Sequence, residues 1–551
     1  MASVPRVDFT TGLTAYLVLL LCLPSQLIFA PLGAAGTPAQ VLGMAFLLYW
    51  SVDWLSRSHP RSEPLTPVRR AMLCLGAAYL LSFALAQARP LPGDEGRSCD
   101  RVMLTVCSWL GVVLIAESVR NRARLDVFLR RLVALVAAVA ALGLFQFVTK
   151  RAWIDHLHVP GLVLNSTLAA VDGRLGFARP AATTSHPIEF GVVLTMVLPL
   201  ALHYAYLQDG RPWWRRWWPP AMLALAVPIS ISRSALLAAI VGMLVLLPSW
   251  PRSKRRPAYG LMVLLGLTVY VAIPGLLGAI RGLFLGIQDD SSARSRTDSY
   301  AIVWEFVKRA PFFGRGPGTF LPSYRILDNQ YLGTLIETGL LGLVALLALL
   351  VVAVVGARRV RARSVDPATR DLAQSLAAGV AAGGVTFATF DGLGFPVSAG
   401  LMLVLLGSVA ALQRLESRTG SSDQVVGLPA LDPAARPGPV RIPSPRPVPL
   451  GSSWRGHLLL VMSGLVLLAV AAGTVVSVLG RDQGVSSSPT VPAVPPVPAT
   501  ISEYDQVEAA QRAVDALVSR FAQSLDVDER RRLLEQIRRL AATPGVTVPN
   551  H

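Results

Sequence analysis

The sequence is poor in charged residues. Only 15% of its 551 residues are Asp, Glu, Lys or Arg, whereas 53% are hydrophobic, and this balance is typical of membrane proteins. Cysteine is scarce as well. The four cysteines form no CxxC pair and lie in or beside apolar runs, which argues against a disulfide framework or a zinc site. There is no internal repeat and no Walker A motif, so nucleotide-driven transport by this chain is not expected.

Apolar runs long enough to cross a hydrocarbon core roughly 30 Å thick recur along the chain. Lipid offers no hydrogen-bond partner to an open backbone, and the runs lack the alternation of barrel strands. The predicted fold is therefore all-α, a polytopic transmembrane bundle of about 12 core helices plus one extra C-terminal span. The first run is long, so we expect an uncleaved span rather than a signal peptide. The predicted spans are 11–32, 37–55, 70–88, 101–118, 129–149, 186–206, 217–232, 234–250, 257–280, 331–355, 371–391, 394–413 and 457–479.

The net charge of +18 is explained by where the basic residues stand. They cluster in alternate connections, after the second, fourth, sixth, eighth and tenth predicted helices. The positive-inside rule makes these connections and the N-terminus cytoplasmic, and it makes the C-terminus extracytoplasmic. Topology thus accounts for the charge, and a nucleic-acid partner is not expected.

The predicted organisation has four parts. Residues 1–414 form the membrane domain, 415–456 a Pro-rich cytoplasmic linker, 457–479 the additional span, and 480–551 an extracytoplasmic tail with a Pro-rich spacer and a helical hairpin. The hairpin either packs on itself or docks an envelope protein through 501–541. Within the membrane domain, the longest connections, 150–185 and 281–330, both face outward, and long ordered connections are more often functional than idle.

The second long connection contains an amphipathic stretch. Tyr300, Val303, Trp304 and Val307 recur at helical spacing, and Pro311 ends the pattern. This predicts a helix that lies on the membrane surface or over a cavity. The alternative is a mere connector.

Charged side chains near apolar spans are costly, so those at the predicted outer ends are candidates for function. Arg233 is the clearest, because SISRSALL places it in a tight connection on the side where arginines are not expected. It forms a structural salt bridge, to Glu337 or Asp328, or reaches lipid headgroups, or binds phosphate with its two-pronged guanidinium. Further outer candidates are Arg174, Arg179, His186, Glu189, Arg294 and Arg296.

Residues 296–342 resemble the motif region of the O-antigen ligase and polymerase superfamily. Its members typically have an arginine opening an amphipathic helix, then P-x-x-G-x-G-x-G, then the helix start N-x-x-L-x-x-x-x-E-x-G-x-x-G. SISRSALL resembles the family's Ser-Arg motif and RLGFARPAATTSHPIEFGVVL its Arg, Gly, Pro segment, and the resemblance extends over residues 100–412. The glycines would permit a tight path and a backbone close to sugar or phosphate. The motif positions are Arg296, Pro311, Gly314, Gly316, Gly318, Asn329, Leu332, Glu337, Gly339 and Gly342.

The resemblance implies a bacterial cytoplasmic-membrane enzyme. It would transfer or polymerise a glycan from a polyprenyl diphosphate carrier onto the hydroxyl of a glycan or glycolipid acceptor, outside that membrane and among membrane lipids. Arg233 and Arg296 would then stabilise the diphosphate leaving group, with Arg174 a weaker third. His186, Asn329 and Glu337 are expected to help bind substrate. No cofactor is expected, and no metal, since the outer carboxylates lack ligand spacing.

One position departs from the family pattern. Family ligases commonly place a histidine, as general base, shortly before the motif asparagine, where this chain has Asp328. We expect Asp328 to accept the proton of the acceptor hydroxyl; alternatively it only orients Asn329 or pairs with an arginine. His186 is a substitute base, although an HP pair entering a helix is more often positional.

Two functions from other classes are open: a transporter or flippase for lipid-linked glycans, and an envelope scaffold acting through the C-terminal tail. A coupled transporter usually carries ionisable residues near the bilayer midplane and some repeat symmetry. In this sequence the few acidic and histidine residues of the runs fall near run ends, which favours the enzyme. They are Asp53, Glu117, Glu189, His203 and Glu337.

Overall fold

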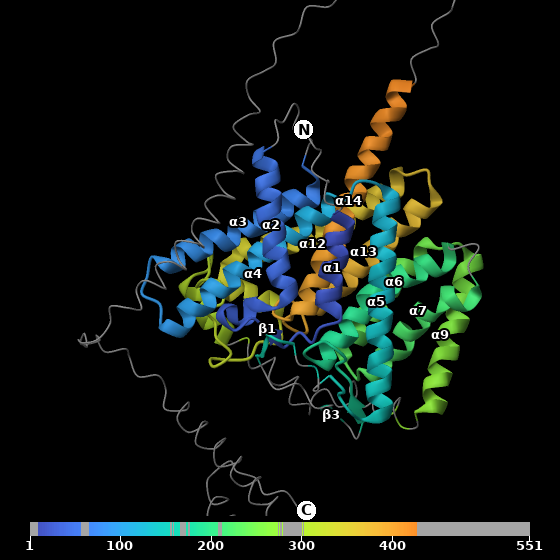
Figure 1. Cartoon of the computed structure of the whole chain (residues 1–551), viewed down its shortest axis with the longest axis horizontal. Helices are drawn as coiled ribbons and strands as arrows, with labels where there is room; N and C mark the ends of the chain where they lie inside the picture. Colours follow the sequence, from blue (N-terminus) through green and yellow to red (C-terminus); the bar gives the residue numbers. More distant parts are fainter. Residues whose placement is uncertain are drawn as a thin grey trace, which may run out of the picture. The chain divides into compact units, whose positions relative to one another are not determined.

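The computed structural model describes residues 9–56, 65–154, 157, 159–165, 172–174, 177–207, 212–273, 275, 278, 300 and 302–426 (Figure 1). The long elements of this part are all helices, which confirms the all-α prediction. They are α1 (Phe9–Leu21), α2 (Pro38–Ser56), α3 (Pro67–Gln87), α4 (Gly93–Glu117), α5 (Arg122–Thr149), α6 (Pro187–Leu207), α7 (Trp213–Ile229), α8 (Arg233–Leu246), α9 (Arg252–Ala272), α12 (Gln330–Arg363), α13 (Pro367–Thr386) and α14 (Pro396–Val426).

The short elements lie in the connections. Two 3-10 helices are η1 (Ala30–Gly36) and η2 (Leu247–Ser249). Strand β1 (Leu27–Ile28) pairs antiparallel with β2 (Val163–Leu164), with Leu27 opposite Leu164. Strand β3 (Asp172–Arg174) pairs antiparallel with β4 (Phe177–Arg179), with Asp172 opposite Arg179.

Several helices begin where a side-chain oxygen accepts a hydrogen bond from a free backbone N–H of the first turn. Thr66 caps α3, Asn121 caps α5 and Asp366 caps α13 in this way. Such caps satisfy donors that have no partner within the helix. Polar residues between apolar runs therefore set where the helices start.

Six helices of the described part are long and apolar enough to cross a membrane, or seven if η1 and α2, bent by 85°, form one span. They are α3, α4, α5, α6, α12 and α14. The chain is thus a multi-pass membrane protein, while thirteen spans stays a prediction: a helix occupies each of the first twelve runs, but α1 has only 13 residues and α8 only 14.

The C-terminal predictions lie mostly outside the described residues. Helix α14 continues to Val426, so the first residues of the predicted linker are helical. The rest of the linker, the span at 457–479 and the tail with its hairpin fall beyond this part, and these predictions are untested.

Helices α12, α13 and α14 lie in the middle of the bundle (Figure 1). Helix α14 packs against α4, α12 and α13, and α13 packs against α6 and α8. Helix α3 packs against α12, and α5 contacts α1, α6 and α7. The buried side chains form one large apolar core, to which α6 and α14 contribute the most thoroughly buried spans.

Two connections on the predicted outer side, the one between α1 and α2 and the one before α6, lie together at one end of the bundle. Ser25 N–H donates to the Thr183 carbonyl over 3.1 Å, which joins the α1–α2 connection to the one before α6. In Figure 1, β1 and β3 lie at one end, and the last turns of α14 project from the other. Which end faces outward stays the prediction from charge.

The amphipathic stretch is helical at residues 302–309. Val303 and Val307 pack on Ile336 of α12, as the pattern indicates. Tyr300 and Trp304 are instead exposed. Within the described part of the chain, therefore, only half of the predicted apolar face packs on the protein.

Candidate functional site

Helix α12 is broken within the family motif. Gly339 has φ +66° and ψ −166°, which are not helical angles. The break frees backbone groups that lipid could not satisfy, and the loop 311–316 pairs with them. The bonds run from Arg315 N to Ile336 O (2.8 Å), Gly316 N to Glu337 O (2.9 Å), Leu340 N to Pro311 O (2.9 Å) and Leu341 N to Phe312 O (3.1 Å).

The motif glycines are required by this contact. A Cβ on Gly339 would lie 2.4 Å from the Phe312 carbonyl carbon, and one on Gly314 (φ +72°) 2.3 Å from that of Glu337. A Cβ on Gly316 would lie 2.5 Å from the Ala86 Cβ of α3. Their close approach is thus to helices of the protein, and it needs no sugar or phosphate to explain it.

The start of α12 carries three of the predicted site residues. The Asn329 Oδ1 accepts hydrogen bonds from Tyr331 N (3.0 Å) and Leu332 N (3.2 Å), so this side chain caps the helix. Asp328 directly precedes the cap and is partly buried. Two turns into the helix, the Glu337 carboxylate accepts a hydrogen bond from the Gly318 N–H, which joins it to the glycine loop.

The α13–α14 connection, residues 387–395, docks on this helix start. Gln330 N–H donates to the Phe387 carbonyl over 2.8 Å, and the Gln330 Oε1 accepts from Leu393 N over 2.7 Å. Gln330 therefore anchors the connection beside Asp328.

Asp391, in this connection, is a residue near Asp328 that the sequence analysis did not single out. Its charge interacts with those of Asp328 and Glu337, so three carboxylates from two segments lie near one another. Burial raises the pKa of Asp391 to about 6, and the negative charge of Asp328 acts in the same direction. An available signal was an aspartate in the turn DGLGFP between two apolar runs.

The first turn of α6 has structural roles. His186 Nδ1 accepts a hydrogen bond from Ile188 N (3.1 Å), and its ring lies 6.3 Å from that of Phe395. This supports the positional interpretation of the HP pair. The buried Glu189 carboxylate accepts from the Ser185 backbone and hydroxyl and, across the bundle, from two N–H groups of α14, Val397 (2.8 Å) and Ser398 (3.0 Å).

The turn between α7 and α8 holds Arg233. Ile231 has φ +45°, and the Ser232 side chain caps α8 by accepting from Ala235 N over 3.3 Å. Arg233 is the first residue of α8 and is partly buried. The N-terminus of a helix carries positive potential, so this turn suits an anion.

Arg179 of β4 holds the same turn from the other side. It is 5% exposed, and its Nε donates to the Ser230 carbonyl over 3.1 Å. A Cβ on Gly191 of α6 would lie 2.6 Å from the Ser230 hydroxyl. The first turns of α6 therefore contact both the Arg233 turn and, through Glu189, the start of α14.

Arg315, which the sequence analysis did not single out, is a further arginine at this end. Its guanidinium pairs with the fully buried Glu95 of α4, which also accepts from the Tyr324 hydroxyl over 2.5 Å. Arg89 donates to the Arg315 carbonyl over 2.6 Å. An arginine at this end can thus serve the fold alone.

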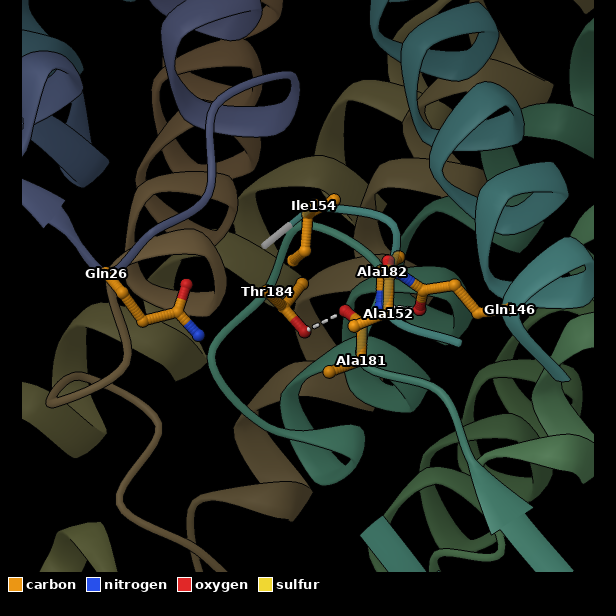
Figure 2. Close-up of a pocket in the computed structure, with 7 residues that line it drawn as sticks. All are labelled: Gln26, Gln146, Ala152, Ile154, Ala181, Ala182 and Thr184. Carbon is orange, nitrogen blue, oxygen red and sulfur yellow. Dashed lines mark hydrogen bonds between the residues drawn. The ribbon is translucent and has the colours of Figure 1, made fainter. Parts of the chain in front are cut away.

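The structure does not describe the side chains of the remaining predicted arginines. Arg296 and Arg294 lie outside the described residues. Arg174 is placed by its backbone in β3, opposite Phe177. A small pocket at the same end contains no predicted site residue (Figure 2); its lining is Gln26, Gln146, Ala152, Ile154, Ala181, Ala182 and Thr184.

A comparison with protein families finds one model, described as O-Antigen ligase, that matches residues 221–347. The match begins in α7 and ends in α12, so it contains Arg233, Asp328, Asn329 and Glu337 but not Asp391. A search of the curated proteins gives no match. The family match supports the O-antigen ligase and polymerase superfamily for this multi-pass membrane protein.

Proposed function

We propose that the protein transfers or polymerises a glycan from a polyprenyl diphosphate carrier onto an acceptor hydroxyl at the outer face of the cytoplasmic membrane. The observation that carries this proposal is the family match at 221–347, which contains both Arg233 and Asp328. Helix α6 contacts the Arg233 turn through Gly191 and the start of α14 through Glu189. Because the connection before α14 docks beside Asp328, these contacts support a single site. The sugar and the acceptor are left open.

In the proposed reaction, the Asp328 carboxylate takes the proton of the acceptor hydroxyl. The hydroxyl oxygen attacks the anomeric carbon, and the bond from that carbon to the diphosphate oxygen breaks. The electron pair leaves with the polyprenyl diphosphate. Arg233, at the positive end of α8, stabilises the charge that develops there, and Arg296 is the second proposed cation.

Asp391 has a supporting role in this proposal. Its carboxyl lies beside Asp328, and its raised pKa means that it is partly protonated near pH 6. The amide of Asn resembles this neutral carboxyl in shape and in charge. We therefore expect the Asp391→Asn variant to keep most of the transfer rate.

The test uses purified full-length protein in liposomes with polyprenyl diphosphate-linked glycans extracted from the source membrane. Release of polyprenyl diphosphate is measured together with the glycan product. Asp328→Asn and Arg233→Ala should each lower the rate by about 100-fold or more. A family enzyme that uses other residues would keep its rate in both variants.

Matched controls come from the same end of the bundle. Asp94 and Arg97 form an exposed ion pair with each other on the first turn of α4. Asp94→Asn and Arg97→Ala should leave the transfer rate unchanged. Equal losses in the control and site variants would overturn the assignment of Asp328 and Arg233.

A further inference from the structure

A second surface combines exposed tryptophans with arginines at the other end of α6. Helix α7 begins with Trp213, and in its first turns Trp213 is 74% exposed, Trp214 58% and Trp218 38%. Arg215 lies over the Trp214 ring at 4.8 Å. The described part of the chain thus leaves much of the surface of these indoles uncovered.

The segments around these side chains pack closely against one another. Arg216 Nε donates to the Ala205 carbonyl near the end of α6 over 2.9 Å. The Tyr206 ring lies 5.1 Å from the Trp217 ring and 5.0 Å from the Trp250 ring, and Lys254 Nζ lies 5.2 Å above it. The end of α6, the start of α7 and the start of α9 therefore form one surface.

The charge of this surface is of one sign. Among the described residues, α7 and α9 contain no Asp or Glu, and Arg215, Arg252 and Arg256 are exposed; Asp209 lies outside the described residues. Asp371 of α13 packs nearby, but its carboxylate accepts hydrogen bonds from Trp250 Nε1 (3.1 Å) and pairs with His203 Nδ1 (2.7 Å). The exposed arginines thus meet solvent or lipid beside exposed indoles. We name Trp213, Trp214, Arg215, Trp218, Arg252 and Arg256 the basic aromatic surface.

We propose that the basic aromatic surface binds the headgroups of anionic phospholipids. Tryptophan favours the boundary between hydrocarbon and water, which places these indoles at headgroup depth. Guanidinium groups at that depth meet lipid phosphates, and a surface whose described exposed charges are cationic selects a net negative headgroup over a zwitterionic one. This inference is independent of the proposed glycan transfer.

The experiment places full-length protein in nanodiscs with equal amounts of phosphatidylglycerol and phosphatidylcholine. The lipids that stay bound after mild detergent extraction are quantified by mass spectrometry. The wild type should retain phosphatidylglycerol in excess. The triple variant Arg215→Gln, Arg252→Gln, Arg256→Gln should lose that excess by about threefold or more, and the matching arginine-to-lysine variant should recover it.

The control removes the same charge elsewhere. Arg358, Arg359 and Arg363 are exposed near the end of α12, a helix without tryptophan. Their triple change to Gln should leave the retained phosphatidylglycerol at the wild-type level. The proposal is overturned if the Arg215, Arg252, Arg256 variant keeps its excess, or if the control loses as much.

Discussion

The two family motifs both interrupt apolar helical segments, and the protein stabilises the two interruptions differently. At Gly339 the freed backbone groups of α12 pair with the backbone of loop 311–316. At the α7–α8 turn, the freed Ser230 carbonyl accepts from the side chain of Arg179. We call the pairing at Gly339 the backbone lock and the Arg179 hydrogen bond the side-chain lock. The backbone lock requires glycine and adds no reactive group, whereas the side-chain lock brings a charged group to the turn. We therefore propose that the glycine motif shapes the backbone of the site and that side chains beside it carry out the proposed chemistry.

The largest loss of stability should follow from disrupting the backbone lock at Gly339. Gly339→Ala places a Cβ against the Phe312 carbonyl in a left-handed conformation, so we expect a loss of about 4 kcal/mol in unfolding free energy. Gly333→Ala, in the same helix with open space around it, should be neutral or stabilising by about 0.5 kcal/mol. Thermal unfolding in detergent measures both, and equal shifts would mean that the lock does not form.

The start of α12, beside which Asp391 lies, and the α7–α8 turn should also differ in their response to pH. Arginines do not titrate near neutrality, whereas Asp391 does. Its pKa of about 6 in the folded protein exceeds the ordinary 3.8, so between these pH values the folded state binds more protons. The contribution of Asp391 to stability should therefore be greatest below about pH 4 and fall by about 2 kcal/mol as pH rises from there through 6. Unfolding measured from pH 4 to 8 should show this fall in the wild type and a smaller one in Asp391→Asn. Parallel curves would contradict it.

The side-chain lock should be somewhat weaker. Arg179→Met removes a charged donor from the buried Ser230 carbonyl, and we expect a loss of about 2 kcal/mol. The exposed Arg97→Met should cost no more than about 0.5 kcal/mol. The unfolding midpoints of the two variants test this prediction. An unchanged midpoint for Arg179→Met would show that the Arg179 hydrogen bond does not stabilise the turn.

The smallest effect distinguishes a cap from a substrate ligand at Asn329. The Asn329→Ala variant removes the capping oxygen and should lower the unfolding free energy by about 1 kcal/mol. The Asn329→Ser variant keeps a capping oxygen and should lower it little. If Asn329 only caps α12, Asn329→Ser should also keep the transfer rate. A large loss of rate with normal stability would instead support the predicted role in substrate binding.

Hydropathy predicted where the helices lie because each apolar run is continuous in sequence. The predicted spans 37–55 and 186–206 differ by one residue at each end from α2 and α6. The extension of α14 to Val426 was missed, since an apolar-run criterion does not detect a helix that continues into polar residues. Gly339 was recognised as a motif position, but the break in α12 was not predicted. It depends on hydrogen bonds to loop 311–316, which hydropathy does not detect.

The candidate site could be predicted only in part, for the same reason. The motif pattern identified Asp328, and the rule for outer arginines identified Arg233. That rule cannot separate functional from structural arginines, as Arg315 shows through its pairing with Glu95. Asp391 was missed because its closeness to Asp328 depends on how the connection 387–395 docks on Gln330.

The Glu189 carboxylate also has a consequence for how the chain is assembled. Two of its hydrogen-bond donors belong to α14, and Val397 stands 208 positions later in the chain. During synthesis, α6 enters the membrane well before those donors have been made. Until then this carboxylate has only local donors such as the Ser185 backbone and hydroxyl and water, so its native hydrogen bonding is complete only after α14 has inserted.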